Sequence, residues 1–245
     1  MPFTPSHAAA VLPFLRTPLP ASALVIGSVA PDLPYYLPTD FPWRTHTALA
    51  IVTTDLVLGA LAWAGWHALL AEPAVAGAPR AVRARLTGVP LGLAVRVATV
   101  ARISWALLAL VVGAATHVLW DEFTHPRRWG TEHLPVLAEP WGLLPGYRWL
   151  QYASGLVGGV VLLLWLLQWW RRTPERPLAP RPAAWPAWVL IAGAGLVAGL
   201  AGALQAPSIG AAAFAGATWG GGAALGVAVV LAVAWHARQR SARPG

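Results

Sequence analysis

The sequence predicts an all-α membrane protein, a polytopic bundle of about five transmembrane helices with short interfacial or re-entrant helices at its N-terminal end. Its 245 residues are 57% hydrophobic and only 11% charged, whereas soluble domains carry about a quarter charged residues. A helix needs about 20 mostly apolar residues to cross the hydrocarbon core of a bilayer. Five runs approach that length, at 47–71, 103–125, 154–170, 184–206 and 210–235. These observations exclude a soluble globular domain.

The segment before the first run is predicted to form short helices. Thr4-Pro5 has the pattern of a helix cap followed by a first-turn proline, which places His7 in the opening turn. The apolar stretch 23–30 is too short to cross a bilayer, so we expect it to lie in the interface or to re-enter the membrane. The segment lacks the basic start of a cleaved signal peptide, so we expect residues 1–46 in the mature protein.

The five runs divide into a core and a C-terminal pair. We expect residues 1–170 to form the core that holds any site, and residues 171–183 to form an arginine- and proline-rich cytoplasmic loop. Residues 184–245 then form two spans and a basic tail. These last spans are rich in glycine and alanine, and small residues let helix backbones approach closely in lipid.

Arginine is the only strongly basic residue type in the chain, and its distribution predicts the orientation of the chain. Cytoplasmic loops retain positive charge, and twelve of the seventeen arginines lie in the loop between the first two runs, in the loop 171–183 and in the C-terminal tail. This places the N-terminus outside the cell membrane and the C-terminus in the cytoplasm. No nucleic-acid-binding motif accompanies these residues, so we expect contacts with membrane lipid and none with nucleic acid.

Histidine and aspartate mark the outer end of the second run, which reads T-H-V-L-W-D-E-F-T-H-P. His117, Asp121 and His125 recur every four residues and would form one stripe on a helix, where neighbours can share a cation. The two histidines lie about 12 Å apart at roughly 1.5 Å per residue. Two alternatives follow, either two metals bridged near Asp121 or one metal with a supporting partner. Pro126 is expected to end the helix.

Three further candidate ligands, His7, Asp32 and His46, lie in the N-terminal segment. The predicted topology brings all six groups to the outer membrane face, and the absence of cysteine leaves histidine and carboxylate as the ligands. We therefore predict a site for one or two divalent metal ions, with zinc as the expected ion. The simpler alternative is that these groups face water at helix ends. For His117 this is less favoured, because the residue lies about two turns inside the hydrocarbon edge, where ionisable groups are costly.

Other ionisable residues are given less weight as ligands. Asp55 lies within the first run and is expected to make a structural hydrogen bond. Glu122 points about 100° away from the predicted stripe, and His133 lies in a loop. His67 and His236 fall toward the cytoplasmic side.

Two functions fit these patterns. The first is a metal-dependent hydrolase at the outer membrane face, in which the metal activates water and Asp121 or Asp32 acts as the base. The outer arginines, among them Arg44, Arg127 and Arg148, would then hold an anionic group, which favours a phosphoester or lipid-linked substrate, although ordinary contact with lipid headgroups explains them equally well. The second is a non-catalytic membrane protein with a structural metal site. A transporter is less favoured, because its site would lie near the membrane midplane.

Longer motifs support a resemblance over roughly the first two thirds of the chain. They are M-P-F-T-P-S-H at 1–7, A-L-V-I-G-S-V-A-P-D-L-P-Y-Y at 23–36, R-T-H-T at 44–47, W-D-E-F-T-H at 120–125 and P-G-Y-R-W-L-Q-Y-A-S-G at 145–155. In these motifs the chain resembles a bacterial membrane-protein family, domain of unknown function 4184.

That family is distantly similar to the membrane-bound metal-dependent hydrolases, which share an N-terminal histidine, a Pro-Asp, a histidine near an arginine and an H-x-x-x-D motif. The resemblance carries these features onto His7, Pro31-Asp32, Arg44 with His46, and His117 with Asp121. It therefore implies a metal site, and it says less about any reaction.

Overall fold

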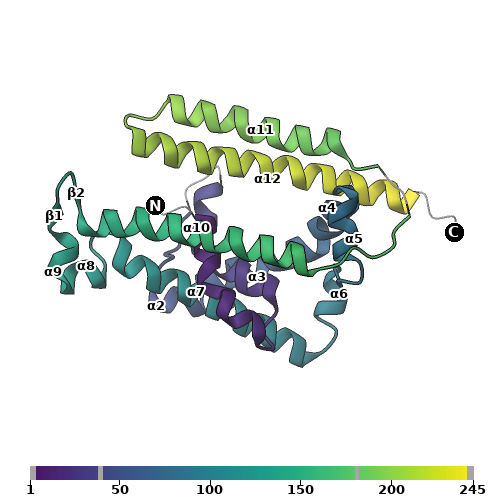
Figure 1. The fold of residues 1–245 in the computed structure, drawn as a ribbon, viewed down its shortest axis with the longest axis horizontal. Helices are drawn as coiled ribbons and strands as arrows, with labels where there is room; N and C mark the ends of the chain where they lie inside the picture. Colours follow the sequence, from purple (N-terminus) through teal and green to yellow (C-terminus); the bar gives the residue numbers. More distant parts are fainter. Residues whose placement is uncertain (1–3, 38–40, 180–181, 242–245) are drawn as a thin grey trace. The chain divides into compact units, whose positions relative to one another are not determined.

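The computed structural model describes residues 4–37, 41–179 and 182–241, and nearly all of its regular structure is helical (Figure 1). Within these residues the only strands are β1 (Pro140–Trp141) and β2 (Leu144–Pro145), which pair antiparallel. The predicted all-α fold is confirmed. Residues 1–3, Arg181 and Arg243, which carry part of the predicted resemblance and orientation, lie outside the described residues.

Five helical stretches of the described chain are long and apolar enough to cross a membrane, which confirms the polytopic architecture. The first stretch is built from α3 (Thr54–Gly65), η3 (Trp66–Leu70) and α4 (Ala71–Gly77), and the second from α7 (Val100–Thr124) and α8 (Trp129–His133). The other three are α10 (Gly146–Arg172), α11 (Trp185–Leu204) and α12 (Ile209–Ser241). Short helices fill the connections, namely α5 (Arg80–Leu86), α6 (Leu93–Arg96) and α9 (Pro135–Ala138).

Two spans begin seven or eight residues away from the predicted start. The first starts at Thr54 and not at Thr47, because the chain turns at Thr53 (φ −123°, ψ −95°) after the short helix α2 (Ala48–Val52). The side chain of Thr47 caps α2 by accepting a hydrogen bond from the backbone N–H of Ala50. The third span starts at Gly146, well before residue 154, because polar residues of its first turns are buried or hydrogen-bonded inside the protein. Apolarity alone does not reveal either boundary.

The N-terminal segment forms three short helices, η1 (Thr4–Arg16), α1 (Ala21–Gly27) and η2 (Ala30–Tyr36). Both η1 and η2 are 3₁₀ helices that contain a proline, Pro13 and Pro34 respectively. Proline removes a backbone donor and disfavours a continuous α-helix, so the segment turns repeatedly and does not form one long helix. This turning lets a single short segment present side chains from several directions.

Contacts divide the chain into two compact units, one formed by residues 1–33, 42–63 and 98–169 and the other by residues 34–41, 64–97 and 170–245. In the first unit α1 packs against the middle of α7. A Cβ added at Gly27 would lie 2.4 Å from the carbonyl oxygen of Leu110, and one at Gly113 would lie 2.4 Å from that of Leu24. Only glycine permits such a close approach of two backbones. The contact brings α1, and with it the N-terminal helices, against α7.

The second unit contains α11 and α12, which lie side by side and antiparallel (Figure 1). Here too glycines form the contact, since a Cβ at Gly199 would lie 2.9 Å from the carbonyl oxygen of Gly216. The outer faces of both helices are exposed and apolar, and Gly202 is the only residue of α11 that is buried. In a bilayer such faces contact lipid.

Candidate metal centre

Helix α7 supplies the two central residues of the site, His117 and Asp121, which lie one turn apart and are 0% and 4% exposed. His117 Nδ1 lies 2.7 Å from the carbonyl oxygen of Ser28. A carbonyl only accepts, so Nδ1 carries the proton and Nε2 keeps its lone pair for the site. Nε2 makes no hydrogen bond within the described chain. The predicted i, i+4 pair is therefore formed.

His7 comes from the first turns of η1 and stacks on His117, with ring centroids 3.8 Å apart and planes 16° from parallel. Its other neighbour is the edge of Trp120, at 5.6 Å between centroids. Burial, followed by the nearby His117, lowers the pKa of His7 to about 4, so the imidazole is neutral at pH 7. Neither ring nitrogen has a hydrogen-bond partner among the described residues, which is unusual for a buried histidine.

Asp32 lies in the first turn of η2 and is 1% exposed. Its Oδ2 accepts a hydrogen bond of 2.7 Å from the Thr4 hydroxyl, and its Oδ1 faces His46 Nε2 at 3.1 Å. Burial acts to raise the pKa of this carboxyl, but the hydrogen bonds from His46 and Thr4 and the nearby imidazole of His117 bring it below its ordinary value. Asp32 is thus held ionised, with one oxygen directed into the site.

His46 enters the site from the loop before α2, where it adopts a left-handed backbone conformation with φ of 60°. This conformation is uncommon for a residue other than glycine and indicates that the surroundings hold it in place. The carbonyl oxygen of His46 accepts a 2.6 Å hydrogen bond from Arg128, and its Nδ1 lies 2.8 Å from the hydroxyl of Thr45. Nε2 is the nitrogen that remains directed at Asp32 and Asp121.

Two imidazoles and two carboxylates from three segments of the chain face one another in pairs. His46 Nε2 lies 3.1 Å from Asp32 Oδ1 and 3.6 Å from Asp121 Oδ2. His117 Nε2 lies 3.6 Å and 3.5 Å from the same two oxygens. Bonds of about 2.0–2.2 Å in a tetrahedral zinc site separate the ligand atoms by roughly 3.4 Å. These four imidazole–carboxylate distances are close to that spacing. Asp32, His46 and His117 thus have the donor types and the spacing to hold a divalent metal ion, and Asp121 faces the same two imidazoles.

His7 extends this set on the other side of Asp121. Its Nε2 lies 3.7 Å from Asp121 Oδ1, whereas Oδ2 of the same carboxylate faces His46 and His117. Two groups able to hold a metal result, with His117 common to both, namely His7, His117 and Asp121, and Asp32, His46 and His117. Within each group the ligand atoms lie within 4.8 Å of one another. Such ligands must be deprotonated to bind, and the neutral His7 meets this requirement.

His125, the sixth predicted ligand, lies at the edge of this cluster and belongs to neither group. Helix α7 ends at Thr124, as Pro126 predicts, so His125 is extended (φ −127°, ψ 149°) and does not continue the helical stripe. Its Nδ1 lies 3.3 Å from Asp121 Oδ1, and its Nε2 accepts from the Gln151 amide at 3.1 Å. With both nitrogens engaged, His125 is placed to orient Asp121, as the hydrogen-bonded partners of metal ligands commonly do.

The three arginines predicted to hold an anion make no described contact with the cluster. Arg44 and Arg127 are exposed, and Arg148 lies with its guanidinium 5.8 Å from the ring of Tyr147. Arg128, the neighbour of Arg127, is the arginine that reaches the site, through the carbonyl of His46.

Residues around the ligands complete the site, although the sequence did not predict this role for them. Thr4, Ser28 and Gln151 hold Asp32, His117 and His125 by the hydrogen bonds given above. Thr4 was predicted as a helix cap, whereas its hydroxyl donates to Asp32. The available signal is that the three residues lie in the motifs at 1–7, 23–36 and 145–155.

Asp55, expected to make a structural hydrogen bond, is fully buried, but neither of its carboxylate oxygens has a hydrogen-bond partner among the described residues. It interacts electrostatically with His46, His117 and Asp32 instead. Its position as the lone carboxylate of the predicted run 47–71 was the available signal.

The remaining ionisable candidates lie away from the cluster. Glu122 accepts from the backbone N–H of Trp129 and lies 3.7 Å from Arg128. His133 is exposed and lies 2.9 Å from the carbonyl oxygen of Trp129. Both connect the end of α7 to α8.

A comparison with protein-family models matches residues 1–239 to the family described as Domain of unknown function (DUF4184). The chain belongs to this family. The match covers the ligands of both metal-holding groups and the C-terminal pair of helices, so the site lies within the DUF4184 domain. No curated protein and no solved structure was found to match the chain.

Proposed function

We propose that this DUF4184 protein is a membrane-embedded metal-dependent hydrolase whose His/Asp cluster holds one or two divalent ions, zinc first among them. The observation that carries the proposal is the pair of overlapping ligand groups that share His117. One tetrahedral structural ion needs four ligand atoms. The cluster offers five ligand residues in two overlapping groups of three, and the two oxygens of Asp121 face different histidines. This surplus is typical of centres that leave a coordination position for water or carry a second ion.

In this proposal, some residues of the cluster hold the metal and one acts as the general base. The bound metal supplies a water whose pKa falls to about 7. His46, His117 and Asp32 would hold the ion, each fixed by a hydrogen bond on its other side. Asp121 is favoured over Asp32 as the base, because His46, His117 and Asp32 form a metal-holding group that does not need Asp121. The 3.3 Å contact from His125 orients Asp121 for that role, and the His125 side chain is 21% exposed, which gives the proton a route to solvent.

A phosphoester, carried by a lipid or a lipid-linked molecule, is the proposed substrate. Arg127 and Arg128 directly follow the His125-Pro126 end of α7, so positive charge lies next to the ligand helix. Arginine binds phosphate through several parallel donors. The spans place the site in a protein surrounded by lipid.

We also place the site at the extracytoplasmic face, with the N-terminus outside and the C-terminus in the cytoplasm. The support is the arginine distribution in the sequence. A reporter that is active only in the cytoplasm, fused after Gly245, should be active. Activity of a periplasmic reporter at the same position contradicts this orientation.

The hydrolase proposal is tested by assaying the detergent-purified, metal-loaded protein against phosphoesters with acyl chains of different length. We expect turnover that a chelator abolishes and that zinc restores. Asp121→Asn should lose at least about a hundredfold in rate, since a general base contributes roughly 10²–10⁴-fold. His133→Gln is the matched control, because His133 is exposed and outside the cluster, and it should keep full activity.

A structural ion is the second candidate, and one observation favours it. The five residues of the two groups are at most 4% exposed, and the cluster ties η1, η2 and the loop before α2 to α7. If the purified protein holds one equivalent of metal, unfolds when it is chelated and hydrolyses none of the phosphoesters, the structural role replaces the catalytic one.

A further inference from the structure

We propose that an apolar pocket between η1, α7 and α10 binds the hydrocarbon chain of a phosphate-bearing membrane lipid and brings its headgroup to the metal centre. The inference rests on the proposed function where it names that lipid as substrate. The pocket itself is argued independently from its lining and its position. Its volume is about 340 Å³.

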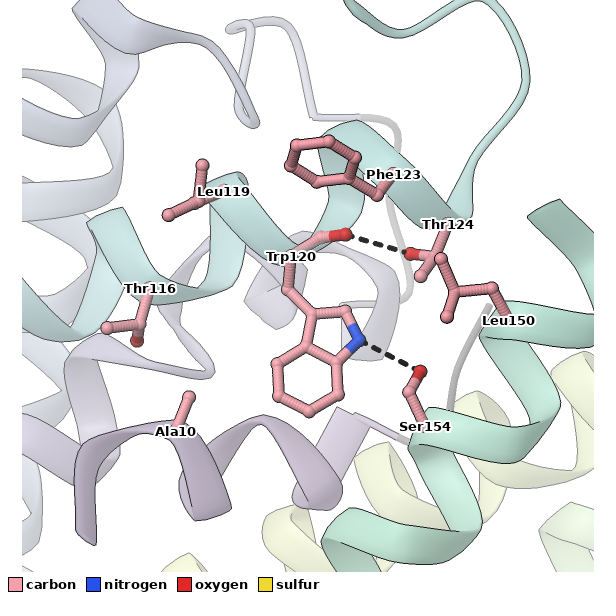
Figure 2. Close-up of a pocket in the computed structure, with 8 residues that line it drawn as sticks. All are labelled: Ala10, Thr116, Leu119, Trp120, Phe123, Thr124, Leu150 and Ser154. Atoms are coloured by element: carbon pink, nitrogen blue, oxygen red, sulfur yellow. Dashed lines mark hydrogen bonds between the residues drawn. The ribbon is translucent and has the colours of Figure 1, made fainter. Parts of the chain in front are cut away.

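Three elements of the first unit line the pocket (Figure 2). Ala10 comes from η1 and forms one side, and the indole of Trp120 lies in the middle. The other lining residues are Thr116, Leu119, Phe123 and Thr124 of α7 and Leu150 and Ser154 of α10. All but Ala10 lie in helical stretches apolar enough to span a membrane.

The polar atoms of the lining are already used within the protein. Trp120 Nε1 donates to Ser154 Oγ at 3.1 Å, and the Thr124 hydroxyl donates to the carbonyl oxygen of Trp120 at 3.2 Å, as Figure 2 shows. The Thr116 hydroxyl donates to the carbonyl oxygen of Gly113 at 2.7 Å. The pocket therefore offers a ligand an apolar surface. A hydrocarbon chain fits this surface, whereas a peptide or a sugar would lose hydrogen bonds on entering it.

Two of the lining residues also belong to the surroundings of the metal centre. The Trp120 ring meets the ring of His7 edge to face at 5.6 Å. Thr124 Oγ1 lies 3.5 Å from Asp121 Oδ1 and 3.2 Å from His125 Nδ1. A chain held against Trp120 thus places its polar end within reach of the part-exposed His125 side of the centre.

Charge at the ends of the two helices favours an anionic headgroup. Arg127 and Arg128 follow shortly after Thr124, and Arg148 lies two residues before Leu150. Of these arginines, Arg128 reaches the cluster through the carbonyl oxygen of His46, and the cluster meets the pocket at Thr124. A phosphate joined to a hydrocarbon chain matches both features, and a membrane lipid provides them in one molecule.

The test uses the full-length protein in nanodiscs that contain phosphatidylglycerol with a photoactivatable diazirine in its acyl chain. We expect the label to concentrate on residues 116–124 and 150–154 above the level on the exposed faces of α11 and α12, which report ordinary lipid contact. Ala10→Trp and Leu150→Trp fill the pocket. Each should lower labelling of these segments about tenfold, the change expected when roughly two methylene groups lose their burial. Leu156→Trp is the control, because Leu156 is 71% exposed on α10 and does not line the pocket.

The possible outcomes distinguish a failure of the lipid-binding pocket from a failure of the proposed hydrolase activity. Labelling that is lost in the two pocket variants, with metal content unchanged, supports the pocket even if no phosphoester is hydrolysed, in which case only the proposed function fails. Label spread evenly over all apolar helices of the wild type overturns the pocket, and this result needs no variant to fold. Unchanged labelling in well-folded Ala10→Trp overturns it as well. If short-chain and long-chain esters are then hydrolysed equally fast, the protein is a hydrolase that does not use this pocket for its substrate.

Discussion

Helix α7 and helix α11 are both long, apolar and able to span a membrane, yet they contribute to the protein in different ways. Helix α7 buries nine of its 25 residues, including His117, Asp121 and Thr124, whereas α11 buries only Gly202. Both make close contacts through glycine. In α7 the glycine contact brings buried polar residues together, and in α11 it joins one apolar helix to another. Close helix packing is therefore common to both units, and the ionisable cluster is specific to the first.

The difference between α7 and α11 should show most strongly when a glycine in each helix is replaced by valine. Gly113→Val puts a side chain 2.4 Å from the backbone of α1, where nothing flexible can yield. Overpacking usually costs about 1–3 kcal/mol, and a clash with backbone should reach or exceed that range and separate the N-terminal helices from α7. We expect loss of folded protein in size-exclusion chromatography and loss of bound metal.

The control for this prediction is Gly193→Val in α11. A Cβ at Gly193 meets nothing within 4 Å, so folding and metal content should match the wild type. Equal damage from both substitutions would contradict the distinction between the two helices.

Metal removal should lower the thermal stability of the first unit, which contains the cluster. An ion that binds only the folded state stabilises it by about 2.7 kcal/mol when its concentration is a hundred times the dissociation constant. Chelation should therefore lower the apparent Tm of the wild type by several degrees, and zinc should restore it. His117→Gln, which removes the ligand common to both groups, should make the Tm insensitive to chelator. An equal response of this variant to chelator would place the metal elsewhere.

A smaller effect is expected from a residue that holds a ligand without binding metal. Thr4→Val removes the hydroxyl that donates to Asp32 Oδ2. Loss of such a partner typically weakens metal binding about 10–100-fold, measurable by competition with a chromogenic chelator. Thr17→Val is the control, because the Thr17 hydroxyl donates to the carbonyl of Phe14 at an exposed site. If both variants bind metal like the wild type, the hydrogen bond to Asp32 does not support the site.

Much of the fold follows from composition and run length, because the bilayer dictates how long an apolar helix must be. The His117 and Asp121 pair is also predictable, since their spacing fixes them on one helical face. The structure brings His7, Asp32 and His46 to that pair, as the predicted topology requires.

Other features depend on tertiary contacts that a linear pattern does not contain. His125 leaves the helical stripe because Pro126 ends α7 and Gln151 holds its ring from α10. The left-handed backbone of His46 depends on surroundings that include Arg128. The share of Asp55 in the electrostatics of the cluster appears only once α3 is placed beside it. In each case the deciding partner is distant in sequence.

Metal analysis of the purified protein decides whether the buried cluster binds a divalent ion. The full-length protein, purified in detergent without added chelator, should carry one or two equivalents of a divalent ion by mass spectrometry of the elements. His117→Ala and Asp121→Ala should carry less than a tenth of that amount at equal folded yield, and His133→Ala should match the wild type. A wild type that takes up no metal even from zinc-supplemented buffer, or one whose metal persists in both cluster variants, would contradict the account.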